Sequence, residues 1–458
     1  MQMLKKIKLS CWLLVTIPVI TMANVTEYQL DNGLKLIVKE DHRAPVVVSQ
    51  VWYKVGSSYE QNGTTGISHQ LEHMMFKGTE NLGPNEFSQI IAANGGRENA
   101  FTGRDYTAYF QTLEKDRLEV SFRLEAERMR KLVIDNTELL KEREVVAEER
   151  RMRTDDNPQA LVSEAFNAAA FVNSPYHHPV IGWMTDINNY EADDLRKWYQ
   201  KWYAPNNATV VIVGDVEPEA VFALAKQYFG PLKPETTALL KPQIEIEQHG
   251  KRMVEIKAPA ELPYMMMGWK VPVVATITED ASWEPYALEM LAGILDGGDS
   301  ARFSRNLIRG EEVAASVGAG YGLFSRLADV FTVAGTPVKG KSTTDLQQAV
   351  MQQITQLQTE LVSEQELNRI KAQVVANAVY ERDTVFYQAM QIGMLETIGL
   401  DWRLSDAYVD NIQAVTAEQV QAVAKKYFIN KGLTVAELIP MPLDGKKPVM
   451  SAGARHDY

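Results

Sequence analysis

The sequence predicts an α+β fold with two homologous halves, in which each half is a mainly antiparallel sheet packed with helices. β-like runs come in neighbouring pairs with short turns between them, as at 34–41 and 46–56. Such pairs favour antiparallel sheets over a doubly wound parallel sheet. Charged amphipathic helices are predicted at 117–129 and 138–152, so both element types occur in one half.

The remaining elements of the first half follow in order. After the first two strands, a helix of about three turns fits between Gly66 and Gly78. Residues 85–96 have helical spacing and end at a glycine pair, and residues 107–113 alternate as a strand does.

A helix–turn–strand pattern occurs twice, at 191–216 and at 416–440. Three pairs of positions share one offset of 225 residues: Leu195 with Val420, Tyr203 with Phe428, and Thr209 with Thr434. A constant offset across a helix, a turn and a strand indicates a duplicated domain. The alternative is a chance alignment of two ordinary helix–strand units.

These patterns divide the chain into five segments. We expect a signal peptide at 1–23, a first domain at 24–232 that carries the candidate site, a linker at 233–252, a homologous second domain without a metal site at 253–440, and a tail at 441–458. The linker falls in a stretch, 229–251, that carries three prolines and no sustained helical spacing, and the tail is rich in Pro, Gly and Lys.

The N-terminus has the layout of a secretory signal peptide. Lysines at positions 5, 6 and 8 precede an apolar run from Leu9 to Met22, and Ala23 offers a cleavage point. The run is too short to span a hydrocarbon core of about 30 Å, although an uncleaved anchor is the alternative. The only cysteine, Cys11, lies in this run, so the mature chain has no thiol and suits an oxidising compartment. We expect export to the periplasm.

Composition limits the function classes. The net charge of −12 and the isoelectric point near 5.3 argue against nucleic-acid binding, which needs a basic surface. After the N-terminal run, the sequence contains no segment long and apolar enough for stable membrane insertion.

The stretch GISHQLEHMMFKGT contains the pattern His69-x-x-Glu72-His73. At about 100° per residue, these three side chains fall within about 100° of one another on a helix. Apolar residues occupy the opposite side: Ile67, Leu71, Met74 and Met75. The helix can therefore pack on a sheet while two imidazoles and a carboxylate converge.

This pattern predicts a catalytic zinc site. Two histidines at i and i+4 can bind one zinc ion, each through one ring nitrogen. Glu72, one turn away, can take a proton from the attacking water, as in the inverse spacing of the His-Glu-x-x-His helix. The alternative is a solvated polar face on an ordinary surface helix.

A catalytic zinc ion needs a third protein ligand. We interpret His177 and His178 as loop residues, so the acidic helix at 138–152 is the better source. Glu142 and Glu149 are seven residues apart and project along nearly the same face. Several other glutamates lie on this helix, and spacing alone leaves the choice open.

Several motifs together resemble the pitrilysin/insulinase family of zinc metallopeptidases, the inverzincins. The similarity is strongest to short members related to the β subunit of the mitochondrial processing peptidase, and it extends from Val25 to about Pro440. Five motifs carry it in one order: LDNGLKLIVKED, GISHQLEHMMFKGT, GGRENAFTGRDYTAYF, EREVVAEE and YAPNNATVVIVGDV.

The resemblance implies a zinc-dependent endopeptidase with one zinc ion per chain and two α/β-sandwich domains of the mitochondrial-processing-peptidase type. It implies that Glu149 is the third ligand beside His69 and His73, and that Glu142 assists catalysis. It further implies that a strand with Asn99 and Ala100 binds peptide substrates by β-augmentation.

One departure from the family concerns an arginine and a tyrosine that hold substrate. The corresponding positions here are Ile308 and Ala315, and the spacing of nearby Arg309 and Tyr321 is wrong. We therefore expect a hetero-oligomer, in which a related zinc-less chain brings the pair; a homodimer is the alternative. A non-catalytic assembly or peptide-binding subunit and a closed structural zinc site are the competing functions.

Overall fold

The structure is a computed structural model that describes residues 25–236 and 240–443. The predicted signal peptide and residues 444–458 of the predicted tail lie outside this range. The first half contains β1 (Val25–Gln29), β2 (Lys35–Glu40), β3 (Val46–Tyr53), α1 (Ile67–Met74), α2 (Glu86–Ala93), β4 (Arg97–Thr102), β5 (Thr107–Glu114), α3 (Leu118–Lys131), α4 (Asn136–Arg150), α5 (Pro158–Ala170), α6 (Met184–Ile187), α7 (Ala192–Trp202), β6 (Ala208–Gly214) and α8 (Pro218–Tyr228).

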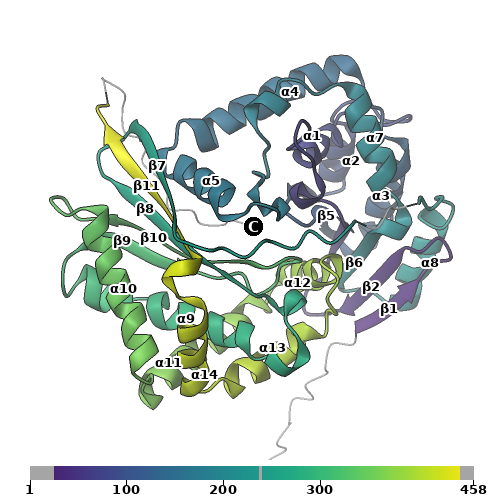
Figure 1. Cartoon of the computed structure of the whole chain (residues 1–458). Helices are drawn as coiled ribbons and strands as arrows, with labels where there is room; N and C mark the ends of the chain where they lie inside the picture. The colour runs from purple at the N-terminus through teal and green to yellow at the C-terminus, as the bar shows by residue number, and fades with distance from the viewer. Residues whose placement is uncertain (1–24, 237–239, 444–458) are drawn as a thin grey trace, which may run out of the picture.

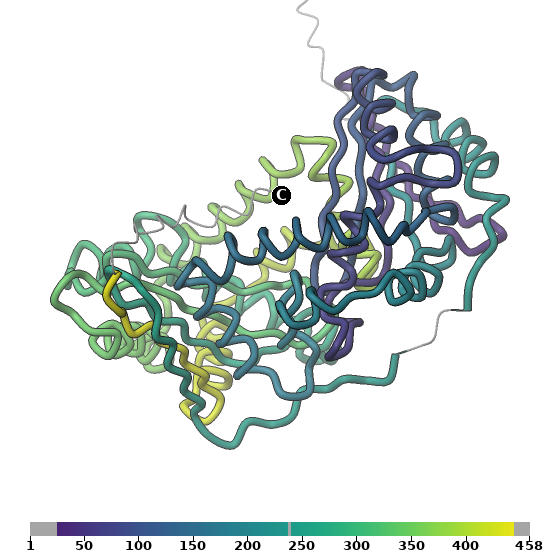
Figure 2. Tube along the Cα trace, turned by 90° about the horizontal axis from the view of Figure 1, so that it is seen from above, coloured from purple at the N-terminus to yellow at the C-terminus, as the bar shows by residue number. Residues whose placement is uncertain are grey.

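The second half begins after a connection, residues 229–251, whose described residues form no helix or strand. This connection runs along the side of the molecule (Figure 2). It contains β7 (Arg252–Pro259), β8 (Tyr264–Val271), α9 (Glu284–Asp296), β9 (Ala314–Gly320), β10 (Asp329–Pro337), α10 (Thr343–Thr359), α11 (Glu364–Glu381), α12 (Val385–Thr397), α13 (Leu404–Ala414), α14 (Ala417–Tyr427) and β11 (Leu433–Met441).

The two sheets share one topology over five strands, and the first sheet has β1 as an additional edge strand. The first sheet has the order β1-β2-β6-β3-β5-β4 and the second has the order β7-β11-β8-β10-β9. In each sheet one pair is parallel, β2 with β6 and β7 with β11, and the other pairs are antiparallel. The predicted α+β class with two mainly antiparallel sheets is therefore confirmed.

The offset of 225 residues recurs in the elements themselves. It relates the start of α7 to the start of α14 and the start of β6 to the start of β11. β6 is rich in β-branched residues and wholly buried at the centre of its sheet, as such a composition favours. The same helix–turn–strand unit therefore occurs in both halves, and in the first half α8 follows it.

Each half contributes a helix that covers the sheet of the other half. α5 packs against β7, β8 and β11, and α12 packs against β3 and β6 (Figure 1). Phe166 of α5 is fully buried in a cluster with residues of the second sheet. Ile392 of α12 is buried with Trp52 and Val211 of the first sheet. This exchange fixes the two halves to each other through apolar cores.

The packing of α12 predicts a sensitive position at Gly393. A Cβ atom there would lie 2.1 Å from Nε1 of Trp52, whose side chain is fully buried. We expect Gly393→Ala to reduce the free energy of unfolding by about 1–3 kcal/mol, because the clash exceeds the helix-propensity gain of about 1 kcal/mol. Urea denaturation checks this result. Gly432→Ala, where an added Cβ meets open space, is the control; equal midpoints for the two variants would contradict the expected clash.

Candidate metal centre

Helix α1 is fixed at its start and along its apolar face. Gly66 precedes it with φ of 83°, and an added Cβ would lie 2.3 Å from the carbonyl oxygen of Ile181, so glycine is required. The buried carboxylate of Glu60 accepts hydrogen bonds from the backbone N–H groups of Gly66 and Ser68 at 2.6 and 2.9 Å. The helix is shorter than the three turns predicted, because a turn begins after Met74.

Helix α1 presents its histidines opposite a buried apolar face, as predicted. The four apolar residues of the opposite side are at most 2% exposed: Ile67, Leu71, Met74 and Met75. His69, Glu72 and His73 project from the other side toward α4 and β4, which both pack against α1. The periodic pattern thus gave the correct burial for this helix.

Helix α4 supplies the acidic side chains. Asp135 caps its start by accepting hydrogen bonds from the backbone N–H groups of Thr137 and Glu138. Glu142 and Glu149 both face His73. Glu148 instead pairs with Arg151 in solvent. The structure thus separates the glutamates that spacing alone left equivalent.

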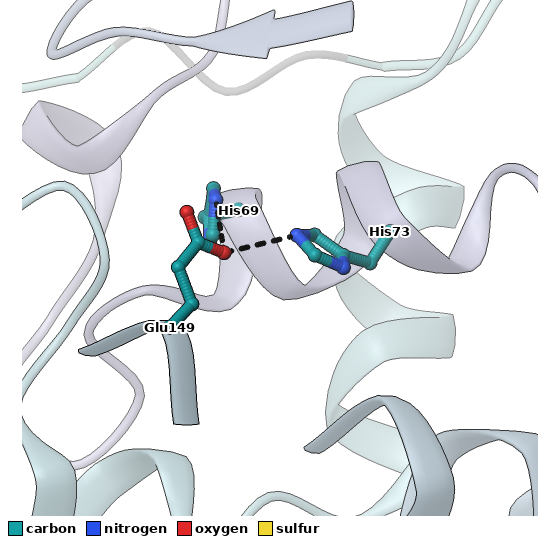
Figure 3. A group of neighbouring side chains, drawn as sticks. All are labelled: His69, His73 and Glu149. Carbon is teal, nitrogen blue, oxygen red and sulfur yellow. Dashed lines mark ion pairs between the residues drawn. The ribbon is translucent and has the colours of Figure 1, made fainter. Parts of the chain in front are cut away.

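Three donor atoms converge between α1 and α4 (Figure 3). Oε2 of Glu149 lies 3.5 Å from Nε2 of His73 and 3.8 Å from Nε2 of His69. Ligands of a tetrahedral zinc ion at about 2.0–2.2 Å are about 3.3–3.6 Å apart. The separation from His73 falls in this range and that from His69 is 3.8 Å, slightly longer, so a small movement would let this donor set hold one zinc ion. The group has no fourth His, Cys, Asp or Glu among the described residues, which leaves a coordination position for water.

The second ring nitrogen of His73 has its own carboxylate. Nδ1 of His73 lies 3.3 Å from Oε2 of Glu142, and Oε1 of Glu142 accepts from Nζ of Lys77 at 2.7 Å. Metal-binding histidines commonly donate their other N–H to a carboxylate, which fixes the ring. Sequence analysis missed Lys77, although it lies in the motif, because it follows the end of the helix.

Burial and neighbouring charges shift the pKa values of the three converging side chains. Burial lowers the pKa of His69 to about 4, so this ring is neutral near pH 7. Burial also opposes charge on His73, but its contacts with Glu142 and Glu149 outweigh burial and raise its pKa to about 9. The pKa of Glu149 falls to about 2, because the hydrogen bond with His73 and nearby positive charges outweigh burial. The site therefore favours positive charge at its centre.

Glu72 is held apart from this group. Its Oε2 accepts a hydrogen bond of 2.5 Å from Oγ1 of Thr102 at the end of β4. Burial raises the pKa of Glu72, which makes its carboxylate a stronger proton acceptor. Thr102 was not singled out from the sequence, because only the pairing of β4 with β5 brings it over α1.

A cavity of about 960 Å³ contains the group. Asn99 and Ala100 line it from β4, an edge strand that pairs only with β5. The N–H of Ala100 donates to Oδ1 of Asn99 at 3.0 Å. His177 and His178, which we interpreted as loop residues, also line this cavity.

The second half contributes Tyr264 to the lining of this cavity, among the described residues. Ile308 and Ala315, the positions of the missing arginine and tyrosine, lie outside it. Arg309 contacts the carbonyl of Asp299, and Tyr321 donates to the carbonyl of Pro272 at 2.7 Å. These two side chains are therefore engaged within their own half.

Comparison with known proteins identifies the family. A family model described as Insulinase (Peptidase family M16) matches residues 35–183, and another, described as Peptidase M16 inactive domain, matches residues 189–374. The zinc protease PqqE of Helicobacter pylori is 35% identical over 351 residues, which cover 75% of this chain and 76% of that protein. The chain belongs to the insulinase (M16) peptidase family. The predicted family membership is thus confirmed.

Solved structures of the M16 family share the fold. The crystal structure of a protease from Helicobacter pylori is 30% identical, has a TM-score of 0.86, and matches 92% of this chain and 100% of that one. The periplasmic protease PqqL from Escherichia coli is 19% identical with a TM-score of 0.75, and the match covers 93% of this chain and 49% of PqqL. At that identity the likeness shows the fold alone.

The M16 comparisons place this chain among relatives that are named zinc proteases. The model described as an inactive domain matches residues 189–374, which lie outside the group of three donor residues. No described helix combines the length and apolarity that crossing a membrane requires.

Proposed function

We propose that this chain is the catalytic subunit of a zinc-dependent endopeptidase that hydrolyses peptides or unfolded polypeptides. The convergence of His69, His73 and Glu149 in one cavity, with Glu72 held separately beside them, supports the proposal most directly. The open position in the group argues against a closed structural site, which would use four protein ligands.

The protein side chains have distinct roles in this proposal. His69, His73 and Glu149 hold one zinc ion per chain, which when bound activates water and polarises a peptide carbonyl. Glu72 takes the proton of the attacking water and delivers it to the leaving amine nitrogen. Glu142 keeps the ring of His73 oriented through its Nδ1 atom.

Substrate binds in this proposal as an added strand along β4, around Asn99 and Ala100. The support is that β4 is an edge strand and that the N–H of Ala100 donates to the side chain of Asn99. Main-chain pairing would bind extended peptides with little sequence preference.

The β-augmentation proposal predicts the effect of Ala100→Pro. Proline is tolerated at an outward position of an edge strand but donates no hydrogen bond. We expect kcat/KM to fall about 10-fold and the zinc content to stay unchanged. A fall of about 10-fold corresponds to the loss of one hydrogen bond of about 1.4 kcal/mol to the substrate. Steady-state kinetics on an unstructured peptide checks this result. Ala100→Ser, which keeps the N–H, is the control; unchanged kcat/KM in the proline variant would place the substrate elsewhere.

We further propose that a related zinc-less chain supplies the arginine and tyrosine. The support is that Ile308 and Ala315 occupy those positions, and that the described second half contributes Tyr264 to the cavity. A homodimer that uses other residues is the alternative. The N-terminal signal layout supports export to the periplasm, the compartment named for the similar protein PqqL.

One experiment tests the proposed function and the partner together. The purified chain is analysed for bound zinc and assayed on unstructured peptides, with and without a related chain that has the arginine and tyrosine. We expect one zinc ion per chain and cleavage only with the partner. Full cleavage by this chain alone would contradict the proposal that a partner chain is required. Bound zinc with no cleavage in either assay would favour the competing function, a non-catalytic assembly or peptide-binding subunit.

A further inference from the structure

A second group of metal-binding side chains lies on the first sheet, away from the cavity. Glu40, His42 and Glu217 each place one ligand atom within 4.8 Å of the others. Glu40 ends β2, and Glu217 directly precedes α8. β2 and β6 are parallel, and Glu40 at the end of β2 pairs with Gly214 at the end of β6. The segments that follow these two strands therefore leave the sheet side by side, at the carboxyl ends of the strands. Sites outside the carboxyl ends of parallel strands commonly bind ligands.

The imidazole in this group is oriented as a metal ligand usually is. Nδ1 of His42 lies 2.6 Å from Oδ1 of Asp215, so Nε2 is the nitrogen that remains to bind a metal ion. Nε2 faces Oε1 of Glu40 at 3.5 Å. Oδ2 of Asp215 accepts from Nζ of Lys115 at 2.6 Å. Lys115 thus holds Asp215 in place, and Asp215 holds the ring of His42. A carboxylate in this position commonly orients a metal-binding histidine.

The duplication supplies an internal comparison for this edge. Ile439 lies 225 residues after Gly214 and pairs with Lys257 as Gly214 pairs with Glu40. The second half therefore has the equivalent parallel strand pair, β7 with β11, and Lys257 stands in place of Glu40. Prolines replace the other two members of the group, Pro259 for His42 and Pro442 for Glu217, and Pro440 replaces Asp215. The fold alone thus requires none of the four side chains.

We propose that Glu40, His42 and Glu217 form a second divalent-metal site, which binds zinc more weakly than the group in the cavity. One imidazole and two carboxylates are ligands that zinc accepts, and water can complete the coordination. The side chain of His42 is 52% exposed, so an ion has access. This inference is independent of the proposed peptidase function.

Occupation of this site would stabilise the contact between the halves. Arg43, next to His42, donates to Oδ1 of Asp383 at 2.6 Å, and Asp41 accepts from Nε2 of Gln388 at 3.1 Å. An ion that fixes His42 would therefore also fix a loop that contacts the second half. A ligand that binds only the folded state raises the unfolding midpoint.

Equilibrium dialysis of the full chain against graded Zn²⁺, with zinc counted per chain, tests the second site. We expect two zinc ions for the unaltered chain, and about 10- to 100-fold weaker binding of the second ion in Asp215→Asn, which keeps all three ligands. His42→Ala should lose the second ion and the zinc-dependent rise in melting temperature. The control His249→Ala, an exposed histidine of the connection, should keep both.

Two outcomes would overturn the second site: one zinc ion per unaltered chain, or a second ion that His42→Ala leaves in place. Glu149→Gln separates the two sites, because it alters the group in the cavity and leaves the second site intact. Loss of the weak ion in this variant would also contradict the proposal.

Discussion

Glu72→Gln is expected to lower kcat by about 10²–10⁴, the usual contribution of a general base, while zinc stays bound. Glutamine has nearly the same shape, and its amide oxygen can still accept from Oγ1 of Thr102, so the position of the side chain is preserved. The amide cannot take a proton from water, however. Zinc content and kcat on an unstructured peptide, measured in the active assembly, check both parts of this result.

The matched control for this substitution is Glu148→Gln. Glu148 is an exposed glutamate of α4 whose ion pair with Arg151 lies in solvent. It should retain full activity, because exposed pairs contribute little to stability. If Glu72→Gln cleaves at the rate of this control, another group transfers the proton and the role proposed for Glu72 is wrong.

The duplicated architecture could be predicted because it is encoded locally. Leu195 and Val420 are buried at the same positions of α7 and α14, so one register relates helix, turn and strand in both halves. The exchange of α5 and α12 could not be predicted in this way. An amphipathic stripe, such as the one with Phe166, shows that a helix buries a face but not which sheet covers it.

Part of the candidate site could likewise be predicted from local sequence, and part of it depends on tertiary packing. His69, Glu72 and His73 lie on one turn of one helix, and helical geometry alone brings them together. Glu149 comes from another helix, and its choice over Glu148 depends on how α4 crosses α1, which is a tertiary property. The family resemblance, not spacing, singled out Glu149.

Polar side chains that hold the site were the hardest to predict. Lys77 and Thr102 carry no periodic signal, since the first follows a helix end and the second ends a strand. Their contacts, with Glu142 and Glu72 respectively, arise only when α1 packs against α4 and β4. The sequence therefore points to the candidate ligands more directly than to the side chains that contact them.

Glu149→Gln is expected to remove zinc from the cavity. Glu149 is the one anionic member of the group, and a neutral amide oxygen is a poorer zinc ligand than a carboxylate. Removing an orienting partner of a ligand typically costs about 10–100-fold in metal affinity, so loss of a ligand itself should exceed about 100-fold. Competition with a chromogenic chelator measures the affinity.

Two further variants make this result specific to the ligand role. Glu142→Gln removes only the group behind His73, so its zinc affinity should fall by about 10–100-fold and its activity should return in excess zinc. Glu144→Gln, exposed on the same helix, should bind zinc as the unaltered chain does. The expected order of affinity loss is therefore Glu149, then Glu142, then Glu144 with none. Loss of the ion pair of Glu149 with Arg153 should by itself hardly change folding, because the arginine side chain is 76% exposed. Unchanged zinc affinity in Glu149→Gln would exclude its carboxylate from the ligand set and, with it, the zinc peptidase mechanism proposed for this cavity.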